Sequence, residues 1–239
     1  MSTKLEIAVF SVEAALEAIK AGAHRIEFCE NPLEGGTTPS YGSLITLRSY
    51  TTQPVFPIIR PRGGDFFYSR SEFEVMKADL LIVKELGYLG AVIGLLNADG
   101  SIDTNRTKEL VDIAGPSMQI SFHRAFDRCK DPFKALEDII ATGCKRILTS
   151  GQVPNAADAL PLLKKLVEQA GDRIIIMPGS GVRSNNSKEI LTATGAKEIH
   201  SSARKMQVSQ MLYSKDSMQE NLQATGVDTE EIKKMLSEL

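Results

Sequence analysis

Short apolar runs alternate with longer amphipathic segments along almost the whole chain, and this alternation constrains the fold more than any other feature. Strands are expected at about 4–9, 24–28, 54–59, 90–95, 118–122, 145–149, 173–177 and 196–200. Helices are expected at about 11–21, 40–50, 71–87, 104–114, 132–142, 156–170 and 185–193. Eight strands alternating with helices over about 200 residues predict parallel pairing, in a closed (β/α)8 barrel or an open doubly wound sheet. We predict the barrel, an α/β fold, because the count reaches the required eight.

The residues that flank the helical segments support this interpretation. Ser11 precedes the first segment and Gly22 follows it, while Asp131 and Pro132 open a later segment that Gly143 closes. Ser and Asp side chains cap helix N-termini, proline suits the first turn, and glycine readily adopts the backbone that ends a helix. The helix boundaries therefore follow the same period as the apolar runs.

The alternation of apolar and amphipathic segments ends near residue 204, after which the chain is polar. We predict a barrel over residues 1–204 and a tail over 205–239 that belongs to the same single domain. The tail ends in an amphipathic helix at 228–239, capped by Asp228 or Thr229, which could cover the barrel or a neighbouring subunit. No linker, low-complexity block or run of charge indicates a second domain.

Composition narrows the classes of function. The 239 residues carry a net charge of −2, so no basic field favours nucleic acid or an anionic membrane surface. No apolar run approaches the roughly 18 residues that span a bilayer, and the N-terminus lacks signal-peptide features, so a cytoplasmic location is expected. The three cysteines have no C-x-x-C spacing, which indicates neither a disulfide framework nor a standard zinc site.

The segment 57–69, with the sequence PIIRPRGGDFFYS, ends a buried strand in two guanidiniums, a carboxylate and two glycines. Arginine suits planar, bidentate binding of an anion, and glycine allows a close backbone approach. Taken alone, Arg60, Arg62 and Asp65 fit a solvated surface turn equally well. Similar polar clusters at the ends of most other strands favour a binding site.

Strand alternation indicates which side chains point into the barrel. Apolar Ile26 should face the helices, which places Glu27 and Cys29 inside, and the same argument places His123 and His200 inside at the ends of two later strands. One inward histidine is usually structural. Two histidines together with carboxylates and arginines favour a ligand site, because buried charges are unfavourable unless they are paired or used.

The loop after the seventh strand, GSGVR at 179–183, resembles the turn that phosphate-binding barrels place there. A tight turn alone explains the G-x-G pattern about as well, but the position and Arg183 favour an anion. We predict that the anion-binding residues at this mouth are Arg60, Arg62, Asp65, Arg124, Ser150, Gly179, Gly181 and Ser201. Catalytic candidates are Glu27, Arg60, His123 and His200.

Several motifs resemble those of the CutC family, which is described as copper homeostasis proteins. They are IIRPRGGDFxYS at 58–69, EFCENPxEGGxTPS at 27–40, FHRAFD at 122–127, LTSGQ at 148–152, GSGVR at 179–183 and HSSA at 200–203. The resemblance covers about residues 4–204, and the tail after 204 looks divergent. It implies a TIM barrel, a cytoplasmic homo-oligomer (dimer or tetramer) and copper tolerance through binding of Cu(I), without an assigned reaction.

Two functions follow from these observations. The resemblance implies a Cu(I) site at Cys29, joined by His123 and His200. Cys129 is a second candidate thiol if its loop folds back, although Cys29 could instead be a buried apolar filler, and Cu(I) prefers more sulfur than this chain offers. The residues themselves favour a barrel enzyme acting on a small anionic or phosphorylated metabolite.

In such an enzyme, Glu27 or His123 would be the general acid or base. A divalent metal held by carboxylate and imidazole also stays open, as does an oligomeric scaffold with a vestigial pocket. We expect no organic cofactor.

Overall fold

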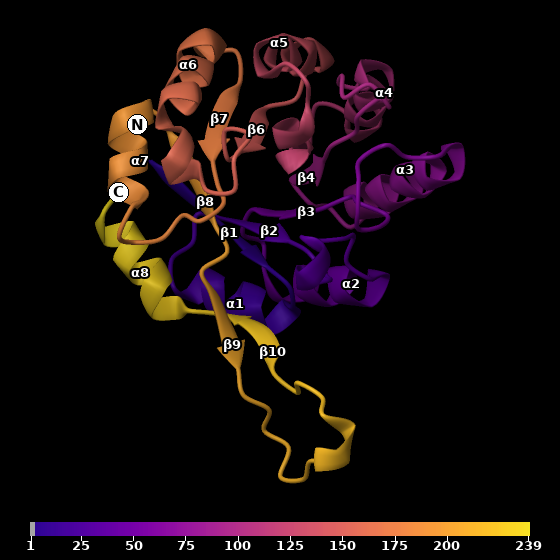
Figure 1. The fold of residues 1–239 in the computed structure, drawn as a ribbon. Helices are drawn as coiled ribbons and strands as arrows, with labels where there is room; N and C mark the ends of the chain where they lie inside the picture. The colour runs from indigo at the N-terminus through magenta and orange to yellow at the C-terminus, as the bar shows by residue number, and fades with distance from the viewer. Residues whose placement is uncertain (1–2) are drawn as a thin grey trace.

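The computed structural model describes residues 3–239 and confirms the predicted TIM barrel (Figure 1). The barrel strands are β1 (Lys4–Val9), β2 (Arg25–Phe28), β3 (Val55–Pro57), β4 (Gly90–Ile93), β5 (Gln119–Phe122), β6 (Arg146–Thr149), β7 (Ile175–Pro178) and β8 (Glu198–Ser201). The helices are α1 (Val12–Lys20), α2 (Tyr41–Tyr50), α3 (Arg70–Glu85), α4 (Thr104–Ala114), α5 (Pro132–Thr142), α6 (Leu160–Ala170), α7 (Ser187–Thr194) and α8 (Thr229–Ser237). Within the described residues, no helix is both long and apolar enough to cross a membrane.

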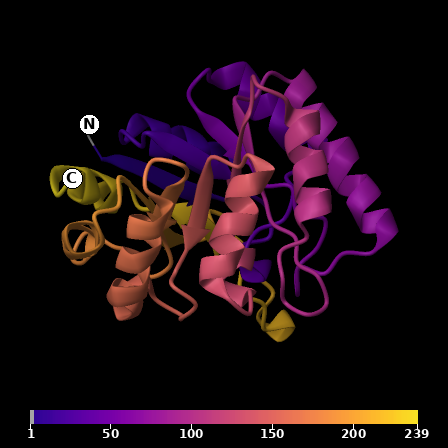
Figure 2. The ribbon, with the colours of Figure 1, turned by 90° about the horizontal axis from the view of Figure 1, so that it is seen from above.

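The strands form two parallel sheets of four, in the orders β3-β2-β1-β8 and β4-β5-β6-β7. Ile58, just after β3, forms a parallel bridge with Val92 of β4, and the Ile59 amide donates to the Val92 carbonyl at 2.8 Å. On the opposite side β7 and β8 lie next to each other. The two sheets thus close into one barrel, with helices around its outside (Figures 1 and 2).

The main apolar core lies between the strands and the surrounding helices. Ile26 and Phe28 of β2 and Ile120 and Phe122 of β5 are buried there, as the alternation predicts. The intervening side chains point into the barrel. Alternate side chains of one strand therefore lie in two environments: the apolar layer between strands and helices, and the polar barrel interior that leads to the mouth of the barrel.

Buried ion pairs fill part of the barrel interior. Arg25 bonds to Glu6 through Nε and to Glu198 through Nη2 at 2.5 Å. Arg146 Nε donates to the same Glu198 carboxylate at 2.8 Å, and Glu6 lies 2.8 Å from Nδ1 of His200. We call this set the interior ion chain. Because each buried charge has an opposite partner, the chain avoids the large penalty of an isolated buried ion.

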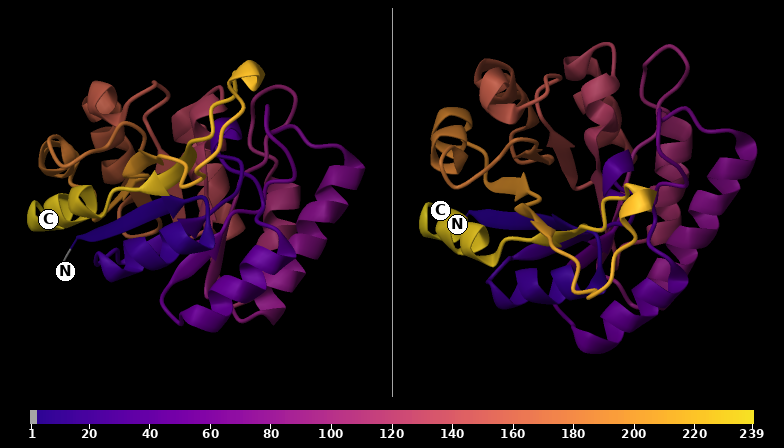
Figure 3. Two further views of the ribbon diagram at one scale, coloured as in Figure 1. Left: turned by 90° about the horizontal axis from the view of Figure 1, so that it is seen from below. Right: turned by 60° about the horizontal axis from the view of Figure 1, so that its bottom comes forward.

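The tail contains more structure than the predicted terminal helix. Strands β9 (Arg204–Gln207) and β10 (Ala224–Val227) pair antiparallel and, with the loop 208–223, form an arm that projects from the barrel (Figures 1 and 3). After the arm, α8 buries Ile232 and Met235 against this same barrel next to α1. Of the two placements considered for the last helix, it therefore packs on its own barrel.

Candidate functional site

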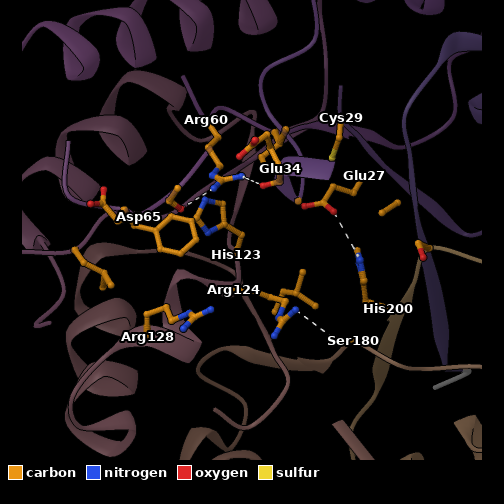
Figure 4. Close-up of a pocket in the computed structure, with 18 of the residues that line it drawn as sticks. Glu27, Cys29, Glu34, Arg60, Asp65, His123, Arg124, Arg128, Ser180 and His200 are labelled. Atoms are coloured by element: carbon orange, nitrogen blue, oxygen red, sulfur yellow. Dashed lines mark hydrogen bonds and ion pairs between the residues drawn. The ribbon is translucent and has the colours of Figure 1, made fainter. Parts of the chain in front are cut away.

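A cavity of about 1160 Å³ opens at the carboxyl ends of the barrel strands. Loops after β1, β2, β3, β4, β5, β7 and β8 contribute to its wall. Of the predicted site residues, nine line it: Glu27, Cys29, Arg60, Asp65, His123, Arg124, Gly181, His200 and Ser201. The other three, Arg62, Ser150 and Gly179, lie outside the lining. Figure 4 shows Glu27, Arg60, His123 and His200 around one space.

Glu27 lies at the end of β2, in register with Ala8 of β1 and Phe56 of β3. Burial raises the pKa of Glu27 to about 7, and the negative charge of Glu6 acts in the same direction, while His200 opposes the shift. The carboxylate lies 3.7 Å from Nε2 of His200. A carboxyl that titrates near neutrality can both take up and release a proton at physiological pH.

His200 lies between two carboxylates, with Nδ1 on Glu6 at 2.8 Å and Nε2 towards Glu27. Burial disfavours its charged form, but the hydrogen bond to Glu6 and the charge of Glu27 raise the pKa of His200 above its ordinary value. Glu6 stays ionised, since Arg25 and His200 outweigh its burial and lower its pKa to about 2. The charge of each of Glu27 and His200 therefore affects the pKa of the other, where the interior ion chain meets the cavity.

Arg60 follows β3 and is only 4% exposed. The loop after β2 holds its backbone, because the Thr38 amide donates to the Arg60 carbonyl and the Thr38 hydroxyl accepts from the Arg60 amide, both at 2.9 Å. Its Nη1 donates to the carbonyls of Glu34 and Gly36, and Nη2 donates to that of Gly64. Among the described residues no carboxylate pairs with Arg60. A buried cation without a counter-ion is favourable for binding an anion.

Arg62 has a different role from Arg60. Its Nε donates to Glu72 at 2.5 Å and its Nη2 to Asp65 at 2.9 Å. Glu72 also forms a capping box with Ser69 at the start of α3. Arg62 therefore ties the loop after β3 to the next helix, and both of its carboxylate partners neutralise its charge.

His123 follows β5, and its imidazole packs against Gly94, where an added Cβ would lie 2.3 Å from the ring. Nδ1 accepts the Ala125 amide at 3.1 Å, which places the ring proton on Nε2. Burial and the neighbouring Arg60 lower the pKa of His123 to about 3, so the ring is neutral. Nε2 is buried and has no partner among the described residues.

Arg124 bridges three loops at the mouth. Its Nε donates to Asp127 at 2.8 Å, Nη2 to Ser150 at 3.0 Å, and Nη1 to Ser180 at 3.1 Å. Asp127 in turn accepts the Ser150 amide at 3.0 Å. Ser150 thus does not line the cavity but holds Arg124 and Asp127 in place through hydrogen bonds. The role of Asp127 was not predicted, although it belongs to the FHRAFD motif.

The loop after β7 passes along the cavity with Ser180 at φ 83° and Gly181 at φ 68°. A Cβ at Gly181 would lie 2.6 Å from Oδ1 of Asn155, so only glycine fits both the conformation and the space. Three further arginines line the cavity and form no ion pair among the described residues: Arg128, Arg183 and Arg204. Arg128 and Arg204 were not predicted, because their part in the site depends on how distant loops fold back.

The structure does not bring the three thiols together. Burial, and next the charge of Glu27, raises the pKa of Cys29 well above its usual value, which favours the protonated thiol. Cys129 lies outside the cavity lining, beside Gln152, and Cys144 is buried before β6. Within residues 3–239 there is no group of three His, Cys, Asp or Glu side chains that could hold a metal ion. The donor set therefore does not fit a soft-metal cage.

Comparisons with known proteins agree on one family. The model of the CutC family matches residues 3–205. A CutC family protein of Chromobacterium violaceum is 46% identical over 228 residues, covering 95% of this chain and 91% of the relative. One from Photorhabdus laumondii is 50% identical over 213 residues, covering 89% and 85%.

Solved structures show the same fold. The protein named as a copper homeostasis protein, CutC, from Streptococcus agalactiae superposes with a TM-score of 0.79 at 33% identity, covering 84% of this chain and 98% of that one. Phosphoribosylanthranilate isomerase from Thermotoga maritima has a TM-score of 0.60 at 11% identity, covering 99% and 97%, which shows the barrel fold alone. With the family model and the close relatives in agreement, the chain belongs to the CutC family.

Proposed function

We propose that the barrel mouth binds a small organic anion, phosphorylated or carboxylated, and that the protein is an enzyme acting on it. The observation that carries this proposal is the buried guanidinium of Arg60, which has no carboxylate partner among the described residues. Arg128, Arg183 and Arg204 line the same cavity without ion pairs there. This positive charge is local, because the whole chain carries a net charge of −2.

Glu27 is the group proposed to transfer protons. It faces the cavity, and burial raises its pKa to about 7, which suits a general acid or base at neutral pH. His123 is a poor base, since its pKa is lowered to about 3. Arg60 and the loop after β7 would hold the anionic end of the ligand, as electrostatic binding sites in such barrels do.

The test is calorimetric titration of the full chain with inorganic phosphate. We expect Arg183→Ala to weaken phosphate binding about tenfold or more, equivalent to ~1.4 kcal/mol, through loss of a charge-assisted contact. Arg173→Ala is the matched control, because Arg173 pairs with Glu137 away from the cavity. Binding that Arg183→Ala leaves unchanged would remove Arg183 from the anion site, and no phosphate binding by the unaltered chain would contradict the proposal.

The second candidate is copper homeostasis through Cu(I) binding, suggested by the name of the S. agalactiae relative. Cys29 supports it, because it is the one thiol in the described residues that lines the cavity. A titration of the reduced protein with Cu(I) against a competing chelator tests it: Cys29→Ser should lower the affinity about tenfold or more if Cys29 is the ligand. Equal affinity in Cys29→Ser and in the unaltered chain would remove this candidate.

We also propose a cytoplasmic homo-oligomer, as the CutC resemblance implies. The arm supports the oligomer, since large apolar side chains are exposed along a segment that has no core of its own: Val208, Met211, Leu212 and Tyr213. Exposed apolar patches of this kind often mark interfaces.

A further inference from the structure

His123 presents a neutral hydrogen-bond donor that nothing else in the described protein uses. Its Nδ1 is occupied by the Ala125 amide, so the proton must be on Nε2. The side chain is only 4% exposed, and Nε2 has no hydrogen-bond partner within residues 3–239. A buried donor without an acceptor is unfavourable in the free protein, so an acceptor supplied by a ligand would relieve this cost.

The surroundings of His123 limit what that acceptor is. The Phe66 ring packs on the His123 imidazole with ring centroids 5.0 Å apart, and Cζ of Arg60 lies 5.1 Å from the centroid of the Phe66 ring. Burial, and next the charge of Arg60, lowers the pKa of His123, so the ring donates one hydrogen bond and carries no charge. Glu27 and His123 face the one cavity from two of its walls (Figure 4). A neutral donor opposite a carboxylate suits a carbonyl oxygen that gains charge during reaction.

We infer that His123 donates its Nε2–H to a carbonyl oxygen of the ligand, and that the substrate is an organic anion, such as a phosphate ester, that also carries a ketone or aldehyde. This inference rests on the proposed anion site. The Phe66 side chain packs against both Arg60 and His123 and so lies next to the proposed carbonyl site.

The chemistry balances without a co-reactant. The Glu27 carboxylate takes the proton from the carbon next to the carbonyl, the C–H electron pair forms a C=C bond, and the carbonyl oxygen becomes an enolate oxygen hydrogen-bonded to His123. When the carbon that loses the proton also bears a hydroxyl, the hydroxyl proton passes to the enolate oxygen, and protonated Glu27 returns its proton to the former carbonyl carbon. The hydroxyl oxygen becomes the new carbonyl oxygen and the Glu27 carboxylate is restored, which completes an isomerisation.

Two probes separate the anion site from the carbonyl site. Ethyl phosphate carries only the anionic group, whereas 2-phosphoglycolate adds a carboxylate that mimics the enolate. We expect the unaltered chain to bind 2-phosphoglycolate about tenfold or more tightly than ethyl phosphate. His123→Phe should abolish most of this difference while leaving ethyl phosphate affinity unchanged, and His123→Gln, which keeps an N–H donor, should restore part of it.

Failure of the inference and failure of the proposed function give different results. If both probes bind and Arg183→Ala weakens both, but His123→Phe leaves their ratio unchanged, the anion site stands and the role of His123 is overturned. If neither probe binds, the proposed function fails. Nitrogen-15 NMR of the unaltered chain shows which ring nitrogen of His123 carries the proton, and it does not depend on whether the variants fold. We expect a neutral imidazole with its proton on Nε2 between pH 5 and 8. A proton on Nδ1 would overturn the inference.

Discussion

Two arginines only two residues apart have opposite surroundings in this protein. Arg60 turns into the barrel mouth, where backbone carbonyls hold it and no carboxylate among the described residues neutralises it. Arg62 turns outward and pairs with Glu72 and Asp65. The charge of Arg60 remains available to a ligand, whereas that of Arg62 stabilises a loop.

The pH dependence of stability should report the environment of Glu27. Its pKa is raised from 4.5 to about 7, so between these values the folded protein keeps a proton that the unfolded chain releases. Stability should therefore fall as pH rises through this range, by about 1 to 3 kcal/mol from this group. In Glu27→Gln the fall should be absent. Urea unfolding at pH 5 and pH 7 measures the change in the free energy of unfolding, and Glu168→Gln, at an exposed position, is the control. An equal change with pH in Glu27→Gln and in the control would refute the raised pKa of Glu27.

Gly181 offers a second test at the residue scale. Alanine there would adopt a left-handed backbone and also meet Asn155, whereas Gly195 has a similar φ of 73° and no atom of the described chain lies within 4 Å of its added Cβ. We expect backbone strain to lower the free energy of unfolding by about 1 kcal/mol in both Gly181→Ala and Gly195→Ala. The contact with Asn155 should lower it further in Gly181→Ala alone, and this variant should also bind phosphate more weakly. Calorimetry showing equal phosphate affinity in the two variants would remove the loop after β7 from the anion site.

At the scale of elements, the barrel strands are joined by charge as well as by backbone hydrogen bonds. Arg25 of β2 contacts Glu6 of β1 and Glu198 of β8, and Arg146 of β6 reaches Glu198 across the interior. The interior ion chain therefore connects the two four-stranded sheets at a place where many barrels have apolar layers.

Breaking the interior ion chain should be costly. Arg25→Met leaves the buried carboxylates of Glu6 and Glu198 without their shared partner, so we expect a loss of about 3 to 5 kcal/mol in the free energy of unfolding. Chemical denaturation measures the loss. Arg173→Met, at an exposed ion pair, is the control and should change little. A small effect for Arg25→Met would mean that the interior ion chain does not hold the strands together.

The sequence predicted the repeating strands and helices and the last helix, but it missed the hairpin between them. Apolar periodicity located all eight barrel strands, and alternation placed Glu27, His123 and His200 inside, because these depend on local pattern. The β9–β10 hairpin escaped, since Arg204–Gln207 is short and fully exposed, with no apolar period to indicate a strand. Alternation also could not tell that Arg62 turns away, because its direction is set by Glu72 of the next helix.

At the scale of the whole molecule, the barrel has its own buried apolar core, whereas the arm exposes its apolar side chains. A two-stranded hairpin is marginal in isolation, and this one carries exposed Leu212 and Tyr213 at its far end. The arm leaves the barrel directly after β8, and Arg204 at its base lines the cavity, so the base of the arm is part of the site.

We expect the full chain to be a dimer or tetramer, and replacement of 208–223 by a short Gly-Ser turn to give a monomer with an intact barrel. Light scattering after size exclusion measures the mass, and circular dichroism checks the fold. Leu33→Asp, at an exposed apolar residue outside the arm, is the control. A monomeric full chain, or an oligomer that survives the replacement, would contradict a role of the arm in assembly.

A crystal structure of the full chain grown with saturating phosphate would show whether the barrel mouth is an anion site. We predict phosphate density inside the cavity, within hydrogen-bond distance of Arg183 or Arg204 and near Arg60. Phosphate bound only on the outer surface, with water alone in the cavity, would show that the barrel mouth is not an anion site.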